Sequence, residues 1–316
     1  MLRVALVGVG GISGAHIPAW QKREDVKLVA LCDVNPKQLE PYDDVHKYTN
    51  FEEMLEQEEI DILDICLPTF LHTKCAVAAL SRGIHVICEK PLSLNKEDVK
   101  LIYDTAEKNQ VCFMTAHVLR FWTEYVELKK IYDSNKYGKL LAGTMFRLGS
   151  MPKWSWDNWM TDESKSGLVT YDLHIHDLDF IVYTFGIPEN VSKHRLKRPD
   201  QDYIQAVYEF EEFAIAAEAS WYAPDYPFKA GFRFQFEKAI VALENGVFTI
   251  YENEGGVVCG DDSLPAEGMV INLPQTDAYA NEINYFVDCV KANEKPDVIK
   301  QSELEAVIDI LRELNN

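Results

Sequence analysis

The chain has 316 residues, of which 47% are apolar and 26% charged, close to the averages for soluble globular proteins. Because one hydrophobic core seldom extends beyond about 250–300 residues, two domains are expected. The formal net charge of −20 argues against partners that are nucleic acids or anionic membranes, since both need a basic surface. No apolar stretch approaches the roughly 18 residues of a membrane span, and Leu2–Val7 is expected to be a buried strand rather than a secretory leader.

The cysteines indicate a reduced compartment. They are odd in number and none forms a CxxC pair: Cys32, Cys66, Cys75, Cys88, Cys112, Cys259 and Cys289. Several lie within apolar runs that are typical of core strands. This favours a cytoplasmic protein over one with a disulfide framework or a zinc site.

Short apolar runs alternate with helical patterns over the first 120 residues. The expected strands are Val4–Val7, Leu28–Cys32, Ile62–Leu67, His85–Cys88 and Val111–Thr115. The expected helices include Phe51–Gln57, Thr73–Arg82 and Lys96–Asn109. Strands that are apolar on both faces and separated by helices predict a parallel sheet covered on each side, so residues 1–121 are expected to form an α/β, Rossmann-type domain.

Residues 122–316 show a different rhythm, with longer segments in which apolar and polar residues alternate. The expected strands are Leu140–Leu148, Ile204–Phe210, Ala214–Tyr222, Phe232–Phe236, Ala239–Leu243 and Val247–Tyr251. The expected helices lie near Glu124–Ser134, Tyr171–Phe185, Tyr279–Ala292 and Ser302–Leu314. This half is predicted to be an α+β substrate-binding and oligomerisation domain with one large, mostly antiparallel sheet. Its last two helices are expected to pack back on the first domain.

A basic cluster, Lys193–Arg198, interrupts the otherwise acidic chain. We interpret it as a solvated edge or loop, with a docking patch as the alternative.

The first strand is followed by a glycine-rich turn, Gly8-Val9-Gly10-Gly11-Ile12-Ser13-Gly14. In a dinucleotide-binding domain the glycine at position 8 permits the tight turn, and the one at position 10 lets the backbone approach the pyrophosphate. Amide groups at the helix N-terminus then face the negative charge. Ser13 stands where glycine or alanine is more usual, but it is small enough for close helix–strand packing. Between a strand and a helix, this pattern predicts a nicotinamide dinucleotide site.

Asp33 ends the second strand, roughly 20 residues further on, where a carboxylate accepts hydrogen bonds from the adenosine ribose. A carboxylate there would repel a 2′-phosphate, so NAD is favoured over NADP. The alternative is an ordinary turn residue before Asn35-Pro36.

The tripeptide Glu89-Lys90-Pro91 directly follows the strand His85–Cys88. Ligands of open α/β sheets bind outside the carboxyl ends of the strands, so Lys90 is expected where nicotinamide and substrate meet. Pro91 restricts Lys90 to extended conformations. Without other signals, such a lysine would be a solvated surface residue.

A second titratable cluster, Asp172–Asp179, lies in the predicted helix that begins near Tyr171. Steps of 100° place Asp172, His176 and Asp179 on one face of a regular α-helix. His174 then points away from His176, which argues against a metal-binding HxH pair, and no metal is expected.

Taken together, these motifs resemble the Gfo/Idh/MocA oxidoreductases, the family of glucose–fructose oxidoreductase and inositol dehydrogenase. The resemblance covers nearly the whole chain. The matching residues are the Gly8–Ser13 turn with His16, Leu67-Pro68 with His72, Gly83–Val86, Glu89-Lys90-Pro91, Arg120-Phe121, Asp172, His176, Asp179, Glu282, Phe286, Pro296 and Glu305-Ala306.

The resemblance implies that Lys90, Asp172 and His176 are the catalytic residues. It implies a cis peptide bond before Pro91 and a substrate domain whose sheet forms homodimers or homotetramers. The residues expected to bind the cofactor are Gly8, Gly10, Gly11, Ile12, Asp33, Leu67, Pro68, His72, Glu89 and Lys90.

The sequence departs from the family pattern at two places. His174 stands where many members have glycine, and Ala116-His117-Val118 replaces a more usual Gly-Phe-Asn. The segment Trp154–Trp159 offers aromatic rings that suit a sugar or cyclitol, or alternatively the core. The residues predicted to contact substrate are His117, Arg147, Trp156 and Asp179.

The leading hypothesis is NAD-dependent oxidation of a secondary hydroxyl in a polyol, cyclitol or sugar. An imidazole with a pKa near ~6.5 suits His176 as the base, although Lys90 is an alternative base. An NAD-dependent glycosidase acting by transient oxidation and a non-catalytic NAD(P)-sensing regulator are the competing functions.

Overall fold

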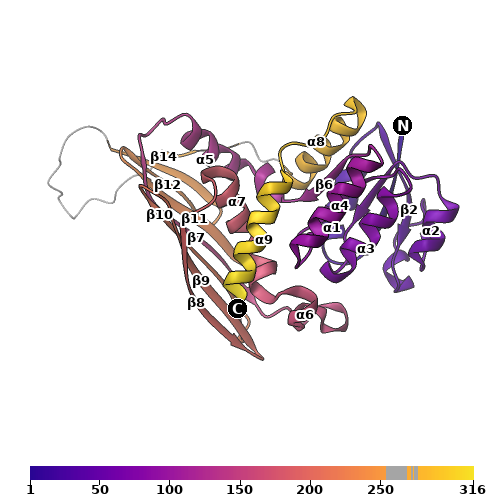
Figure 1. Cartoon of the computed structure of the whole chain (residues 1–316), viewed down its shortest axis with the longest axis horizontal. Helices are drawn as coiled ribbons and strands as arrows, with labels where there is room; N and C mark the ends of the chain where they lie inside the picture. Colours follow the sequence, from indigo (N-terminus) through magenta and orange to yellow (C-terminus); the bar gives the residue numbers. More distant parts are fainter. Residues whose placement is uncertain (254–268, 272, 274–276) are drawn as a thin grey trace. The chain divides into compact units, whose positions relative to one another are not determined.

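The computed structural model describes residues 1–253, 269–271, 273 and 277–316; Cys259 lies outside these residues. The chain forms two compact units. Unit 1 comprises Met1–Phe121, Asp162–Ser166 and Asp277–Asp309, and unit 2 comprises Trp122–Thr161, Gly167–Thr276 and Ile310–Asn316. Figure 1 labels the elements of each.

Unit 1 is built on a six-stranded parallel sheet with the order β3-β2-β1-β4-β5-β6. Its strands are β1 (Leu2–Val7), β2 (Val26–Cys32), β3 (His46–Tyr48), β4 (Ile62–Ile65), β5 (His85–Glu89) and β6 (Phe113–Ala116). This is the doubly wound order of dinucleotide-binding domains, and the Rossmann-type prediction is confirmed. The order reverses between β1 and β4, which is where such sheets bind ligands.

Helices join and cover these strands (Figure 1). They are α1 (Ser13–Gln21), α2 (Phe51–Gln57), α3 (Thr69–Leu80), α4 (Lys96–Lys108) and α8 (Ala278–Ala292), with short 3₁₀ turns at Pro36–Leu39 and Val118–Phe121. The one-turn helix α6 (Glu163–Ser166) also belongs to unit 1 and contacts α3. α1 packs on α8, and α3 packs on α4. The last helix, α9 (Gln301–Asn315), begins in unit 1 and ends in unit 2.

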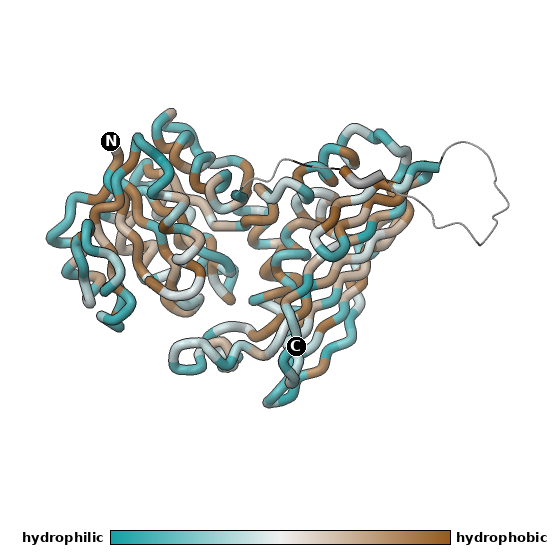
Figure 2. The backbone as a smooth tube through the Cα atoms, turned by 180° about the vertical axis from the view of Figure 1, so that it is seen from behind, coloured by the Kyte–Doolittle hydropathy of each residue, from teal (hydrophilic) through white to brown (hydrophobic). Residues whose placement is uncertain are grey.

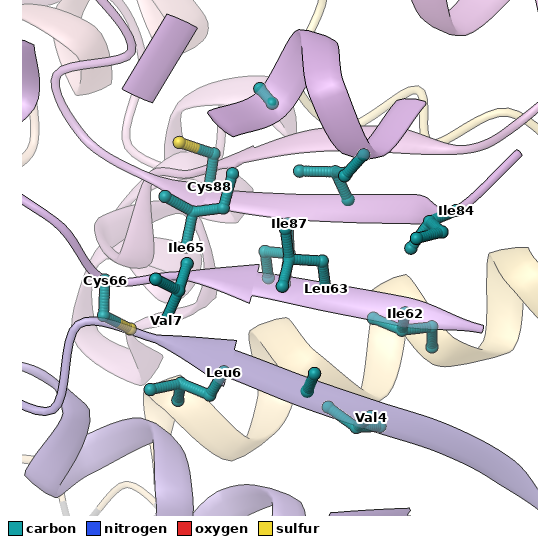
Figure 3. Packing of buried hydrophobic residues seen from close by; sticks show 14 of the residues in the cluster. Val4, Leu6, Val7, Ile62, Leu63, Ile65, Cys66, Ile84, Ile87 and Cys88 are labelled. Carbon is teal, nitrogen blue, oxygen red and sulfur yellow. The ribbon is translucent and has the colours of Figure 1, made fainter. Parts of the chain in front are cut away.

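The core of unit 1 explains why the apolar runs form strands. Side chains of β1, β4 and β5, including those of Leu6, Ile62 and Ile87, are fully buried and pack on one another (Figure 3). Figure 2 shows hydrophobic residues along the strands and hydrophilic residues along the loops. Each buried side chain of this size stabilises the fold by roughly 1.5–3 kcal/mol.

Unit 2 is built on an eight-stranded sheet with the order β14-β13-β12-β11-β7-β10-β9-β8. Its strands are β7 (Leu140–Ser150), β8 (Asn190–Arg198), β9 (Gln201–Glu209), β10 (Ala214–Tyr222), β11 (Lys229–Phe236), β12 (Ala239–Glu244), β13 (Val247–Glu252) and β14 (Met269–Val270). β7 and β10 pair in parallel, whereas all the other described pairs are antiparallel. The prediction of a large, mostly antiparallel sheet is confirmed.

Two helices lie on one face of this sheet, α5 (Thr123–Asp133) and α7 (Ile175–Phe185), and aromatic rings join them to it. Tyr125 of α5 makes edge-to-face contacts with Phe180 of α7 and with Phe232 of β11, at centroid distances of 5.0 and 5.1 Å. Phe185 stacks on Phe234 of β11. A 3₁₀ turn at Trp156–Thr161 and a π-helical turn at Thr170–His174 precede α7.

The basic cluster Lys193–Arg198 forms most of β8, the edge strand next to β9. The structure therefore adds a strand where the sequence predicted a solvated edge or loop. Charged side chains at an edge strand hinder pairing with another sheet. Among the helices that the structure describes, none is long and apolar enough to cross a membrane.

Candidate functional site

The glycine turn after β1 has the geometry that the sequence predicts. Gly8 has a φ of +93°, and its amide donates to the Cys32 carbonyl at 2.9 Å. A Cβ at Gly8 would lie 2.6 Å from the Cys66 carbonyl oxygen, so only glycine fits between β1 and the residues that follow β4.

The next glycine faces open space. A Cβ added at Gly10 would meet nothing within 4 Å, and both Gly10 and Gly11 are exposed. Helix α1 begins at Ser13, whose hydroxyl donates to the Gly10 carbonyl at 2.7 Å, and no side chain caps its N-terminus at Ile12. The uncapped amides and the open approach fit a phosphate group.

Asp33 lies beside this turn. One carboxylate oxygen accepts from the Val9 amide at 2.8 Å, and the other accepts from the Asn35 amide at 2.8 Å. Asp33, which follows β2, is thus held against Val9 of the glycine turn.

The segment after β4 holds Leu67 and Pro68, both half-buried, at the N-terminus of α3. His72 of α3 is buried, with Nδ1 2.9 Å from the Pro91 carbonyl oxygen and Nε2 2.7 Å from that of Leu67. Burial lowers the pKa of His72. Both ring nitrogens therefore face the main chain, and His72 links the loops that follow β4 and β5.

At the end of β5, the Glu89 carboxylate is buried and accepts from the Lys90 amide at 3.0 Å. The half-buried Lys90 precedes Pro91 through a cis peptide bond, as the resemblance implies. Apart from His72, which lies on α3, the residues of unit 1 predicted to bind cofactor thus lie at or directly after the carboxyl ends of β1, β2, β4 and β5. Their glycines, open approach and carboxylate fit a dinucleotide.

In unit 2 the predicted helix does not begin as an α-helix. Asp172 lies within the π-helical turn Thr170–His174, and His176 lies in the first turn of α7. The wider turn invalidates the 100° steps counted from Tyr171. Asp172 and His176 are half-buried, whereas Asp179 is only 1% exposed and belongs to the interior.

The residues that enter this turn are in left-handed conformations. Gly167 has a φ of +72°, and its space is bounded by the Tyr171 ring. Leu168 has a φ of +61°, which is strained for a branched side chain. Strain of this kind and π-helical turns both occur frequently at functional sites.

His174 and His176 lie in different environments. It is completely buried, and its Nε2 lies 2.6 Å from the Tyr208 hydroxyl on β9. Burial, together with the positive charges of Arg195 and Arg147, lowers the pKa of His174 to about 3. His174 is therefore a neutral core residue at neutral pH.

Arg147 of β7, predicted to contact substrate, lies in the interior of unit 2. Its Nη2 lies 2.9 Å from Oδ1 of the fully buried Asp177 and 3.2 Å from the Tyr125 hydroxyl. The sequence did not point to Asp177 as a partner, because the two residues are 30 positions apart. The guanidinium has a structural ion pair, which weakens its assignment to substrate.

Of the remaining predicted substrate residues, His117 is 2% exposed and Trp156 is 57% exposed. Trp154 is 75% exposed, so two of the three tryptophans in this segment are outside the core. Asp157 and Asn158, which follow Trp156, both have positive φ.

The sequence interpretation did not predict a further cluster of titratable side chains. His16, Asp64 and Cys66 are the one set of metal-capable side chains that the described residues bring together. His16 Nδ1 lies 2.8 Å from Asp64 Oδ2, a hydrogen-bonding distance. The signal was an aspartate inside Ile62–Ile65, a strand expected to be apolar on both faces.

Comparison with known proteins agrees with this geometry. Residues 2–117 match the family model described as "Oxidoreductase family, NAD-binding Rossmann fold" of GFO/IDH/MocA, and residues 125–248 match the GFO/IDH/MocA C-terminal domain. The chain belongs to the Gfo/Idh/MocA family. Within this family the glycine turn and Asp33 lie in the NAD-binding domain.

Two curated Gfo/Idh/MocA relatives illustrate the range of similarity. The 2,7-anhydro-N-acetylneuraminate hydratase of Mediterraneibacter gnavus is 27% identical over 190 residues, which cover 60% of this chain and 50% of the relative. The chain thus spans about half the length of the first curated relatives it matches, with 50%, 54% and 58% for three of them. The myo-inositol 2-dehydrogenase of Thermotoga maritima is 25% identical over 319 residues, covering 94% of this chain and 90% of the relative.

The fold recurs in solved structures. Levoglucosan dehydrogenase in complex with NADH and levoglucosan has a TM-score of 0.83 and 18% identity, covering 99% of this chain and 96% of that one.

Proposed function

We propose that this Gfo/Idh/MocA protein is an NAD-dependent oxidoreductase that transfers a hydride between nicotinamide and a secondary hydroxyl of a polyol, cyclitol or sugar. The observation that carries the proposal is the Asp33 carboxylate held 2.8 Å from the Val9 amide of the glycine turn. The myo-inositol dehydrogenase relative, which aligns over 94% of the chain, supports the class of substrate.

The cofactor is NAD rather than NADP. The half-buried Asp33 would hydrogen-bond the adenosine ribose and repel a 2′-phosphate. Gly8, Gly10, Gly11 and Ile12 would surround the pyrophosphate. Leu67, Pro68 and Lys90 would line the remainder of the site, and His72 and Glu89 would support those loops from beneath.

Three side chains would act on the substrate, while NAD, when bound, supplies the hydride acceptor. His176 would take the proton of the reacting hydroxyl. Lys90 would donate a hydrogen bond to the same oxygen and stabilise its developing negative charge, an effect worth ~3 kcal/mol by comparison with other oxyanion donors. Asp172, in the π-helical turn before His176, would orient the substrate or the imidazole.

The exposed Trp156 is the substrate contact with the most direct support, because its ring lies outside the core. An aromatic face suits the apolar side of a sugar or cyclitol ring. His117 and Asp179 are buried, so we propose that they support the residues of the site and do not contact the substrate directly.

A second candidate is redox-neutral chemistry on a sugar, in which oxidation is transient and the cofactor is restored. The 27%-identical relative named as a hydratase favours it, because hydration involves no net oxidation. An NAD-dependent glycosidase belongs to the same class.

We also propose a cytoplasmic homodimer or homotetramer assembled through the sheet of unit 2. Large apolar side chains on these strands and their loops are exposed: Leu141, Phe228, Ile240, Val247 and Tyr251. A second copy of this face would bury them, and Ile240→Asp would then shift the mass measured by light scattering toward the monomer. The six described cysteines are free and buried, in keeping with a reducing compartment.

The experiment is a screen of NAD reduction at 340 nm against inositols, free sugars, sugar acids and glycosides, repeated with NADP. We expect reduction with at least one polyol or sugar and a higher kcat/KM with NAD. Substrate consumption without NADH formation would instead identify the redox-neutral candidate. Tight NAD binding with no turnover of any compound would contradict both.

A further inference from the structure

Three ionisable side chains are buried together in unit 1, beneath the proposed cofactor site. His16 and Asp64 are 0% exposed and Glu89 is 6% exposed. Buried charges are costly unless they are paired and hydrogen-bonded. A group of this kind therefore needs either a structural or a functional reason.

Both nitrogens of the His16 ring face carboxylate oxygens. Nδ1 lies 2.8 Å from Asp64 Oδ2, and Nε2 lies 3.0 Å from Glu89 Oε1. An ionised carboxylate only accepts hydrogen bonds, so the ring satisfies both contacts only as an imidazolium that donates from each nitrogen.

The surroundings support the charged form. Burial lowers the pKa of His16, whereas the neighbouring Asp64 and Cys66 side chains raise it, and the pKa of His16 lies well above its usual range. The Trp20 indole donates to Asp64 Oδ2 at 2.7 Å, and the Cys66 thiol approaches the other Asp64 oxygen at 3.5 Å. The ring of Tyr279, on α8, packs against the His16 ring, with 5.6 Å between the ring centroids.

A metal site is the competing interpretation of His16, Asp64 and Cys66. The 2.8 Å separation of Nδ1 and Oδ2 is that of a hydrogen bond, and Nε2 is already directed at Glu89. The geometry therefore favours the hydrogen-bonded network.

The network joins the segments that carry the proposed chemistry. His16 belongs to α1, directly after the glycine turn, and Asp64 belongs to β4, before Leu67. Glu89 ends β5, and its second oxygen, Oε2, accepts the amide of Lys90 at 3.0 Å. One imidazole thus fixes the carboxylate that holds the main chain at Lys90.

We propose that His16 and Glu89 are positioning residues for Lys90, with the His16 ring clamping Glu89 against β4 so that the Lys90 backbone keeps a fixed orientation relative to the glycine turn. The role of Lys90 itself rests on the proposed function. The clamp is a statement about unit 1 alone, and it is testable without turnover.

The first measurement is the ¹⁵N spectrum of wild-type protein labelled at histidine. The clamp predicts that both His16 nitrogens stay protonated from pH 6 to pH 8, assigned by the signal lost in His16→Gln or, if that variant does not fold, by the signal altered in Glu89→Gln. A neutral His16 tautomer at pH 7 would overturn the proposal. So would stoichiometric zinc or another transition metal in protein purified without added divalent ions.

The second measurement is amide exchange of the peptide containing Lys90, followed by mass spectrometry in His16→Gln and Glu89→Gln. The matched control is His85→Gln at the other end of β5, where Nδ1 accepts from the Cys112 amide at 2.9 Å. Exchange is expected to rise at least tenfold in the two clamp variants and to stay within twofold in the control. Equal exchange in all forms would overturn the clamp.

Once the screen has identified a substrate, His16→Gln should lower kcat at least tenfold while the KM for NAD changes less than threefold. His85→Gln should change neither by more than twofold. A rise in the KM for NAD with kcat unchanged would make His16 a support of the cofactor turn rather than of Lys90. If no form turns over any compound, the proposed function fails, and the spectrum and the exchange rates still decide the clamp.

Discussion

The carboxylate of Asp33 accepts a hydrogen bond from the amide of Val9 at 2.8 Å, joining the end of β2 to the glycine turn that follows β1. Two residues 24 positions apart are thereby placed at one edge of the sheet. Because that carboxylate repels a 2′-phosphate, it is expected to determine which nicotinamide cofactor is used.

Asp33→Ser should therefore lower kcat/KM for NAD by about tenfold or more and bring NADP to a comparable value, since one hydrogen bond to a charged group contributes roughly 1.5–3 kcal/mol. The test is to measure kcat/KM with NAD and with NADP for the wild type and the variant. Asp44→Ser, at an exposed aspartate after β2, is the control. An unchanged preference in Asp33→Ser would show that Asp33 is only a turn residue.

Gly8 and Gly10 of the turn should respond differently to substitution by alanine. Gly8→Ala forces a Cβ to within 2.6 Å of the Cys66 carbonyl at a φ of +93°, so it should reduce the free energy of unfolding by about 2 kcal/mol or more. Gly10→Ala meets nothing within 4 Å in the protein, so it should leave stability within about 1 kcal/mol and weaken NAD binding at least tenfold.

Gly14→Ala is the matched control, because a Cβ there also meets nothing within 4 Å and Gly14 lies within α1. It should retain NAD affinity and stabilise the helix by up to about 1 kcal/mol. Calorimetry of NAD binding together with urea unfolding tests the set. Gly10→Ala that binds NAD as tightly as the wild type would place the pyrophosphate elsewhere.

The ion pair of Arg147 and Asp177 is buried, so removing one partner leaves the charge of the other buried and uncompensated. Arg147→Met should reduce the free energy of unfolding by about 3–5 kcal/mol, and the double variant Arg147→Met/Asp177→Leu should lose less than the two single losses together. Chemical denaturation of the four forms measures the coupling. If Arg147 bound substrate instead, Arg147→Met would raise the KM while stability stayed near that of the wild type.

His174 should make stability depend on pH. Burial lowers the pKa of His174 to about 3, while in the unfolded chain it is near ~6.5. Between these values the unfolded state binds the extra proton, so the contribution to stability is complete above about pH 6.5 and is lost as the pH falls, by up to ~1.4 kcal/mol per pH unit.

The measurement compares wild type with His174→Phe, whose ring does not titrate. The difference in free energy of unfolding should be constant between pH 7 and pH 8 and should decline between pH 6.5 and pH 5. A difference that does not vary over the lower range would mean that His174 is protonated in the folded protein.

The fold could be predicted largely from the sequence because its signals are local. The run Ile62–Ile65 is apolar apart from Asp64 and forms a buried parallel strand, and the turn at Gly8 needs a conformation that glycine adopts freely. β8 was missed because its charged residues carry no apolar period, and it is a strand only because β9 offers a neighbouring edge.

The site was harder to predict because its partners are distant in sequence. Asp64 and Asp177 are stabilised by His16 and Arg147, which lie 48 and 30 positions away. The π-helical turn at Asp172 comes after the left-handed pair Gly167 and Leu168, and no helical period in the sequence indicates it.

The central claim is that Lys90 and His176 both act in the proposed hydride transfer. A double-mutant cycle with Lys90→Met and His176→Ala tests it, with the exposed Lys100→Met and His194→Ala as controls. Each catalytic variant should lower kcat/KM by about 10²–10⁴, and the double variant should be close to the worse single one, because groups that act as a unit are not additive. NAD affinity should remain within a few fold. Single variants within a few fold of wild type, or losses that simply multiply in the double variant, would contradict the claim.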